Sequence, residues 1–440
     1  MRLQGTMQVN EEGRLTIGGC GVEQLARQFG TPLYIFDEAH IRENCRQFYQ
    51  SFGVAAGYSR VIYAGKAFLT TAMCRIIASE GLGLDVVSGG ELYTALTAGF
   101  PAKDIFFHGN NKSYAELCQA LEAGIGRFVV DNFAEMELLS RLAAERGQKA
   151  RVILRITPGI EAHTHKYIRT GQIDSKFGFT LPNGQAMAAA QRVKELPGLE
   201  FKGLHCHIGS QIFELEPYSQ AAATMLELAA QIKAATGLIT TELDLGGGFG
   251  IYYTNEDRPC SIREYAETIL GRVKEEARAL NLPVPQVIVE PGRSIIGPAG
   301  CTAYTVGTIK EIPGVRKYVA VDGGMTDNIR PALYGAKYEA IIANKAARPP
   351  VETVAVTGKC CESGDMLIWE AKLPRVEAGD ILVVTATGAY GYTMSSNYNR
   401  LGRPAAVLVY NGSADLIIKR EDFNDLLRND VLPPRLSNPE

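Results

Sequence analysis

Short apolar runs alternate with amphipathic stretches between residue 38 and about residue 295. Eight of these runs are candidate strands: RVIYA near 61, LDVV near 85, IFF near 106, RFVV near 128, RVILRI near 153, FKGLHC near 203, ELDLG near 243 and QVIVE near 288. Such near-continuous apolar character is typical of parallel strands that are buried on both faces. Eight β-α units therefore predict a (β/α)₈ barrel of the TIM type rather than an open sheet.

The stretches between the runs carry helix signals. SIREYAETILGRVKEEARAL opens with Ser261 and Glu264 in capping-box spacing, which marks a helix start. PYSQAAATMLELAAQIKAATG has Pro217 at its beginning and Gly237 just past its end. Both segments are therefore predicted to be crossover helices.

The pattern changes after residue 300, where short strand-like runs follow one another through glycine-rich turns. The first 35 residues look similar. We therefore expect the barrel at 36–295, an all-β, Greek-key-like barrel domain made of 1–35 with 296–425, and a C-terminal tail at 426–440.

Length and composition agree with this picture and exclude several kinds of partner. A chain of 440 residues is expected to form two domains. A net charge of −3 gives no reason to expect nucleic acid or an anionic membrane as a partner. The sequence has no apolar run of membrane-span length, no signal-peptide core, and nine cysteines without a C-x-x-C pair, so we expect a cytoplasmic protein with reduced thiols.

Polar residues gather at the predicted carboxyl ends of the barrel strands, where enzymes of this fold place their catalytic groups. The set is Lys66, Asp85, Ser88, His108, Arg155, His205, His207, Gly246 to Gly248, Glu290 and Arg293. Taken singly, a lysine is usually a surface residue, and a histidine at a strand end is usually a hydrogen-bonded structural residue. Their convergence on one face favours a functional site.

Two of these elements can be interpreted in two ways. The DLGGGFG loop suits either a phosphate, with Ser210 and Tyr390 as further donors, or a plain tight turn. Glu290, at the tip of a buried strand, needs a cationic partner, which is either Arg293 or a protonated ring nitrogen of a cofactor.

An amine, a phosphate loop, a carboxylate and an imidazole are together the groups that pyridoxal 5′-phosphate requires. In that interpretation Lys66 forms the Schiff base and the carboxylate keeps the ring nitrogen protonated. A metal site is the alternative, with His163 and His165, or His205 and His207, as paired ligands.

Several motifs resemble those of diaminopimelate decarboxylases over nearly the whole chain, in order. In the barrel they are YAGKAF, LDVVSGGELYTAL, FHGNNKS, LRITPGIEAHTH, DSKFGF, GLHCHIGSQI, DLGGGFG and EPGRS. In the C-terminal part they are VDGGMTDNIRPALY, GKCCESGDML and TGAYGYTMSSNYNR. The resemblance implies an alanine-racemase-type barrel with a β domain, and a homodimer whose active sites are shared between subunits.

The resemblance also implies roles for individual residues. Lys66 is similar to the Schiff-base lysine, and His207 to the imidazole stacked on the cofactor ring. The implied cofactor contacts are Lys66, Asp85, His207, Ser210, Gly247, Gly248, Glu290, Gly292, Arg293 and Tyr390. The implied substrate contacts are Arg293, Arg330, Tyr334, Glu362 and Tyr390.

Cys361 is similar to the cysteine that the partner subunit supplies for catalysis. The preceding Cys360 is not part of the general pattern, so the residue that returns a proton to the product is left open between Cys361, Cys360 and Lys66.

The activity implied is decarboxylation of meso-2,6-diaminopimelate to L-lysine and CO₂, the last step of lysine biosynthesis. A distal carboxylate on the substrate suits the two arginines, whereas ornithine or lysine would leave them unpaired. The alternatives are a decarboxylase for a carboxyspermidine or a carrier-bound glutamyl group, a racemase, and a cofactor-binding regulator without activity.

Overall fold

The computed structural model describes residues 2–160 and 174–436, and the chain divides into two compact units. One unit is His40–Pro298, and the other combines Met1–Ala39 with Ala299–Glu440. No helix of the described residues is long and apolar enough to cross a membrane.

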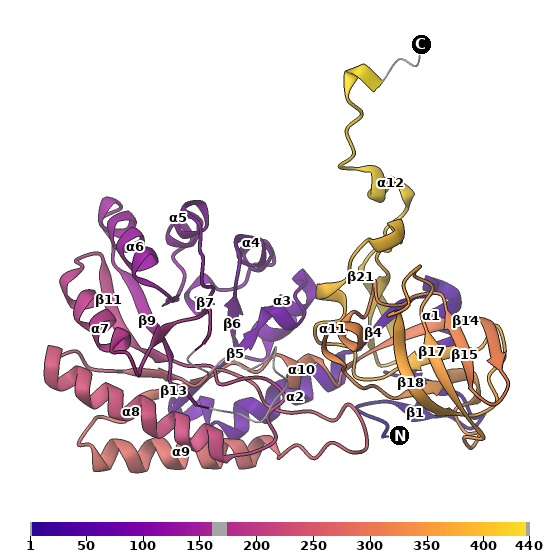
Figure 1. Cartoon of the computed structure of the whole chain (residues 1–440). Coiled ribbons are helices and arrows are strands. Elements are labelled where there is room, and N and C mark those ends of the chain that lie inside the picture. Colours follow the sequence, from indigo (N-terminus) through magenta and orange to yellow (C-terminus); the bar gives the residue numbers. More distant parts are fainter. Residues whose placement is uncertain (1, 161–173, 437–440) are drawn as a thin grey trace. The chain divides into compact units, whose positions relative to one another are not determined.

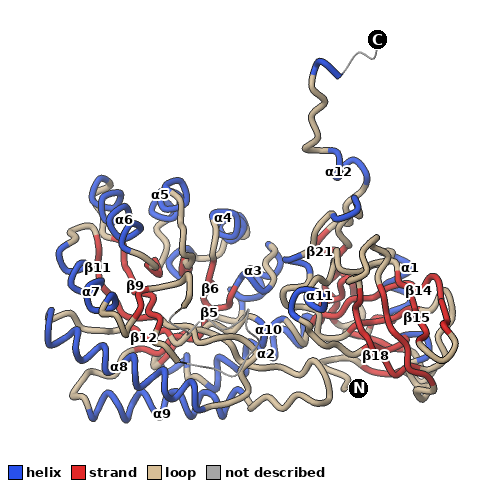
Figure 2. The backbone as a smooth tube through the Cα atoms, in the orientation of Figure 1, coloured by secondary structure: helices blue, strands red, loops and turns tan. Residues whose placement is uncertain are grey.

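The unit His40–Pro298 is a closed barrel of eight parallel strands (Figures 1 and 2). In barrel order they are β5 (Ser59–Ala64), β6 (Gly83–Val86), β7 (Ile105–Phe107), β8 (Arg127–Val130), β9 (Ala150–Thr157), β11 (Leu199–His205), β12 (Glu242–Asp244) and β13 (Gln286–Val289). Pairing of β13 with β5 closes the ring, and the short β10 (Phe179–Thr180) adds to β9. All eight predicted strands, and the TIM-type barrel, are confirmed.

Helices surround the barrel strands (Figure 2). They are α2 (Glu38–Ser51), α3 (Thr71–Ser79), α4 (Gly89–Thr97), α5 (Tyr114–Ala123), α6 (Phe133–Glu145), α7 (Gln185–Glu195), α8 (Glu216–Thr236), α9 (Ile262–Ala279) and α10 (Arg293–Ile296). The capping box of Ser261 and Glu264 forms at the start of α9, and Gly237 ends α8 in the left-handed conformation at φ 78°. Both helix predictions are confirmed.

Apolar side chains from the strands fill the barrel interior. A fully buried cluster joins Ile62, Phe106, Val129, Ile153 and Ile288, one from each of five strands. Because this core closes the barrel below the strand ends, the polar residues at the carboxyl ends stand on a rigid base.

The other unit is built on β-sheets, as predicted. A small sheet contains β1 (Gln8–Val9), β2 (Leu15–Ile17) and β3 (Cys20–Gly21). The larger sheet contains β4 (Leu33–Asp37), β14 (Gly300–Ile312), β15 (Arg316–Val321), β16 (Ala340–Ile342), β17 (Glu352–Thr357), β18 (Met366–Leu373), β19 (Ile381–Val384), β20 (Ala405–Tyr410) and β21 (Ser413–Ile418). The α-helices of this unit are α1 (Val22–Phe29), α11 (Arg330–Tyr334) and α12 (Phe423–Leu427).

The N-terminal segment contributes strand β4 to the sheet that the C-terminal part of the chain forms. Strand β4 pairs antiparallel with β14 and parallel with β20, and all five of its residues are buried. An apolar alternation in the sequence does not mark strand β18, because its exposed Trp369 and Glu370 interrupt that pattern.

Candidate active site

Lys66 lies at the carboxyl end of β5, in a single helical turn at Gly65–Ala67. Its Nζ is 3.6 Å from Oδ2 of Asp85, which lies near the carboxyl end of β6 and is completely buried, while 38% of the Lys66 side chain is exposed. The amine is therefore held beside a buried carboxylate and is not an ordinary surface lysine.

Three buried side chains continue from Asp85 across the strand ends. His108 Nε2 is 3.8 Å from Asp85 Oδ1 and 2.9 Å from Glu290 Oε1, and His205 Nε2 is 3.4 Å from the same oxygen. The two imidazoles pack edge to face with 5.0 Å between ring centroids. No hydrogen bond within the described residues reaches either carboxylate oxygen of Asp85 or Oε1 of Glu290.

Burial controls the protonation of this cluster. Burial raises the pKa of Asp85, although His108 and Lys66 act against it. Burial also acts to raise the pKa of Glu290, but the imidazoles of His108 and His205 outweigh it and lower that pKa well below its usual range. The pKa of His205 is lowered by burial to about 4. Glu290 is therefore the carboxylate that keeps its charge.

The glycine loop after β12 contacts two neighbouring strand ends. The Gly247 N–H donates to His207 Nδ1 at 3.2 Å, which orients that imidazole. A Cβ on Gly247 would lie 2.2 Å from the Glu290 carbonyl oxygen, and one on Gly248, at φ +100°, would lie 2.4 Å from that of Gly209. Both positions require glycine, because any side chain would push the loop away from the site.

Arg293 begins α10 and is 6% exposed. Its Nε and Nη2 donate to Ser210 Oγ at 3.2 and 2.9 Å, and its Nη1 donates to the Tyr253 hydroxyl. Gly292 precedes it, and a Cβ there would lie 2.9 Å from Ala64 Cβ. Arg293 is therefore joined to the predicted phosphate donor Ser210, whereas Glu290 contacts His108 and His205 and interacts with the buried carboxyl group of Asp244.

Four of the five predicted substrate residues lie in the β unit, and two of them, Arg330 and Tyr334, belong to its helix α11; the fifth, Arg293, lies in the barrel. Arg330 opens α11, is buried, and donates to the Tyr338 hydroxyl. Tyr334 ends the same helix and is half-buried. Tyr390 lies in the turn after β19, is half-buried, and has the unusual φ of 61°.

The loop between β17 and β18 carries the two adjacent cysteines. Cys360 is half-buried with its Sγ 4.0 Å from Thr326 Oγ1, and burial raises the pKa of its thiol to about 11. Cys361 and Glu362 are exposed. Of the two thiols, Cys361 is the one that faces outward.

A buried carboxylate anchors this loop. Oδ1 of Asp365 accepts the Met325 N–H at 2.6 Å and Oδ2 accepts the Cys360 N–H at 2.8 Å. Asn399 Oδ1 accepts the Cys361 N–H at 2.7 Å. Asp365 and Asn399 were not singled out in the sequence, because their partners are backbone groups that no residue pattern reveals.

The barrel residues fit pyridoxal 5′-phosphate. Asp85 and Glu290 present buried oxygens without hydrogen bonds, Lys66 stands beside Asp85, and the glycine loop follows the end of a neighbouring strand with no room for side chains at Gly247 and Gly248. A cofactor with a reactive aldehyde, a ring nitrogen and a phosphate matches this donor set.

The described residues bear on one of the two alternative paired-histidine metal sites. His163 and His165 lie outside the described residues, and His207 turns its Nδ1 to Gly247. The grouping present among the described residues is instead His108, His205 and Glu290. The sequence placed both of these histidines at strand ends but did not show that they share one carboxylate.

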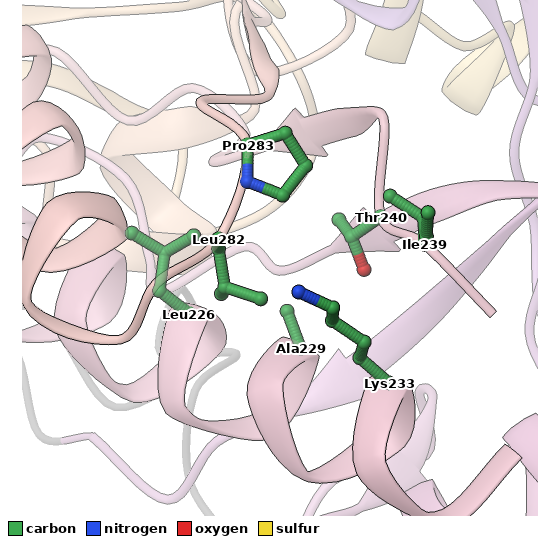
Figure 3. A pocket seen from close by; sticks show the side chains of 7 residues that line it. All are labelled: Leu226, Ala229, Lys233, Ile239, Thr240, Leu282 and Pro283. Carbon is green, nitrogen blue, oxygen red and sulfur yellow. The ribbon is translucent and has the colours of Figure 1, made fainter. Parts of the chain in front are cut away.

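The described cavities away from this site offer no comparable chemistry. Leu226, Lys233 and Thr240 are among the residues that line a void of about 10 Å³ (Figure 3), which is too small for a cofactor. A groove of about 760 Å³ lies against α9 and the amino ends of β5 and β13. Because barrel enzymes use the carboxyl ends of their strands, the cluster around Lys66 is the candidate active site.

Known proteins share these features. Residues 38–297 match the family described as "Pyridoxal-dependent decarboxylase, pyridoxal binding domain". The diaminopimelate decarboxylase of Bacillus subtilis is 53% identical over 98% of both chains, and that of Synechocystis is 50% identical over 98% of this chain and 93% of that one. The crystal structure described as "Diaminopimelate Decarboxylase from m. jannaschii in co-complex with L-lysine" superposes with a TM-score of 0.92 at 36% identity, covering 99% of this chain and 100% of that one. The chain belongs to the diaminopimelate decarboxylase family of pyridoxal-dependent decarboxylases.

Proposed function

We propose that this protein decarboxylates meso-2,6-diaminopimelate to L-lysine and CO₂ with pyridoxal 5′-phosphate as its cofactor. The observation that carries the proposal is the Lys66 amine at the tip of β5, beside Asp85 and within a full-length family match. When bound, the cofactor supplies an aldehyde that captures amino groups and a ring that accepts electrons.

The barrel residues are proposed to hold that cofactor. Lys66 binds it covalently, and the glycine loop with Ser210 and Arg293 binds its phosphate. Glu290 faces the ring nitrogen as a carboxylate, and His207, oriented by Gly247, lies against the ring. Asp85 is proposed to hold the Lys66 amine in place beside its carboxyl group. Gly292 and Tyr390 are proposed as further contacts of the cofactor.

The β unit is proposed to select the substrate. Arg330 of this unit is proposed to offer its guanidinium group to a distal carboxylate, as is Arg293 of the barrel, since a planar fork binds carboxylate in two places. Glu362 binds the distal ammonium group, and Tyr334 and Tyr390 contact the substrate between these ends. A diamine-forming substrate lacks the distal carboxylate and would leave the arginines unpaired.

Proton return to the product is assigned to Cys361 or Lys66. Cys361 is exposed, whereas Cys360 is half-buried with a pKa near 11, which disfavours it as the acid at neutral pH. We further propose a cytoplasmic homodimer in which Cys361 and Glu362 serve the partner's site. Their exposure on this single chain and the nine free thiols of the described structure support this arrangement.

The test is CO₂ release from the purified protein with added cofactor, measured separately with meso-diaminopimelate, ornithine, lysine and carboxyspermidine. We expect release from meso-diaminopimelate, with lysine as the other product. Release from one of the other compounds instead would contradict the proposal.

A further inference from the structure

His108 occupies a position between two buried carboxylates that no assigned role explains. We propose that His108 is a positioning residue that bridges Asp85 and Glu290 and holds Glu290 as an ionised carboxylate in one orientation. The inference rests on the proposed function, in which Glu290 faces the ring nitrogen of the cofactor.

The backbone and the ring of His108 are both fixed. Its N–H donates to the Val86 carbonyl at 2.8 Å, which ties the end of β7 to β6. Its side chain is 3% exposed, with Nε2 2.9 Å from Glu290 Oε1 and 3.8 Å from Asp85 Oδ1. The Nε2 atom therefore lies between the two carboxylates and closer to Glu290.

The site holds more carboxyl groups than it can keep ionised. Asp85, Asp244 and Glu290 are all buried at neighbouring strand ends, and several charges in a dry environment cannot coexist without partners. Lys66 faces Asp85, whereas His108 and His205 both face Glu290. The imidazoles thus select which carboxyl group stays charged, in agreement with the raised pKa of Asp85 and Asp244 and the lowered pKa of Glu290.

His108 also completes a continuous line of contacts. Lys66 Nζ contacts Asp85, Asp85 contacts His108, and His108 contacts Glu290, with separations of 3.6, 3.8 and 2.9 Å. The line joins the two residues that are proposed to contact the cofactor at its aldehyde and at its ring nitrogen. A residue that served packing alone would not need a ring nitrogen aimed at both carboxylates.

The experiment uses His108→Leu, His108→Gln and His108→Asn in the full-length protein. Apoprotein of each variant is titrated with pyridoxal 5′-phosphate, and the affinity and the absorption bands of the bound cofactor are recorded without substrate. We expect His108→Leu to weaken cofactor binding by about tenfold or more and to change the ratio of the bands, because Glu290 loses its nearest imidazole. Glutamine should restore binding to within about threefold, because its amide can reach the Nε2 position, whereas asparagine should not.

His205→Leu is the matched control, since it removes a second buried imidazole from the same carboxylate at the longer distance of 3.4 Å. The loss of cofactor affinity in His205→Leu should be clearly smaller than in His108→Leu. An equal loss in the two variants would assign the effect of His108→Leu to packing and overturn the proposal. An unchanged affinity and spectrum in His108→Leu would also overturn it.

If circular dichroism shows that His108→Leu is unfolded, the glutamine and asparagine variants decide, and equal values for them contradict the proposal. Failure of the proposed function would appear separately, as wild-type protein that binds cofactor but releases no CO₂ from meso-diaminopimelate.

Discussion

At the scale of single residues, burial and a neighbouring charge give common side chains unusual chemistry. Lys66 is one of many lysines, but only the fold places it 3.6 Å from the fully buried Asp85. Glu290 and Asp85 are both carboxyl groups, yet their surroundings move their pKa values in opposite directions. Pairs of titratable groups that are separated in this way are typical of active sites.

Lys66→Ala should abolish both the visible absorbance of the bound cofactor and activity, because the covalent attachment and a proton carrier are lost together. The expected fall in kcat is roughly 100- to 10,000-fold, as for the removal of a group that transfers protons. The exposed Lys103 provides the control, since Lys103→Ala should leave both properties unchanged. A retained absorbance that borohydride bleaches would refute the role of Lys66.

The adjacent cysteines allow a second test at this scale. Cys361→Ala should lower kcat with diaminopimelate by about 100-fold if its exposed thiol returns the proton. Cys360→Ala should change kcat by less than about threefold, because its thiol is half-buried against Thr326. Steady-state kinetics on both variants decide the matter, and the reverse ranking would show that Cys360 is the acid.

At the scale of elements, the loop between β17 and β18 depends on one buried carboxylate. Asp365 joins the Cys360 N–H to the Met325 N–H, and the Gly324 and Gly358 positions have no room for a Cβ beside it. The loop that presents Cys361 and Glu362 is therefore anchored at its base, while its tip stays exposed.

Asp365→Ala should lower the free energy of unfolding by about 2–4 kcal/mol, because the N–H groups of two partly buried residues, Met325 and Cys360, lose a carboxylate acceptor. Thermal unfolding checks this value, with Glu370→Ala on the exposed face of β18 as the control. Asp365→Asn should cost less, since its amide oxygen still accepts one bond. An unchanged melting temperature for the alanine variant would show that the loop does not depend on this anchor.

Glu362→Ala is expected to impair turnover of diaminopimelate while leaving cofactor binding intact, because Glu362 lies at the exposed tip and far from the phosphate donors in the sequence. The readouts are kcat/KM and cofactor absorbance. An equal loss of both would show that Glu362 is a structural residue.

At the scale of the whole molecule, the β unit combines both ends of the chain. Strand β4 lies between β14 and β20 in one sheet, so the two ends of the sequence form a single core. In the proposed dimer, each active site would need residues from two chains.

Mixing Lys66→Ala with Cys361→Ala tests that dimer. Each variant alone should be inactive or nearly so, whereas hybrid dimers contain one intact site. After subunit exchange, random pairing predicts recovery of about a quarter of the wild-type activity. Light scattering should show dimers, and no recovery in demonstrably exchanged dimers would mean that the site lies within one chain.

The sequence alone was enough for much of the fold and for the family. Apolar runs identified all eight barrel strands and glycine-rich turns identified the β domain, because burial on both faces and tight turns leave local patterns. Lys66, the glycine loop and Glu290 were recognisable because each stands at the end of such a run.

Only the tertiary structure decided which residues are partners. The sequence left Glu290 between Arg293 and a cofactor, whereas the fold brings to it His108 and His205, which are 182 and 85 positions away. It also decided that Cys361 faces outward and Cys360 inward, through backbone bonds to Asn399 and Asp365. These contacts depend on strand register and on loop anchors far apart in the chain, so no local pattern of residues contains them.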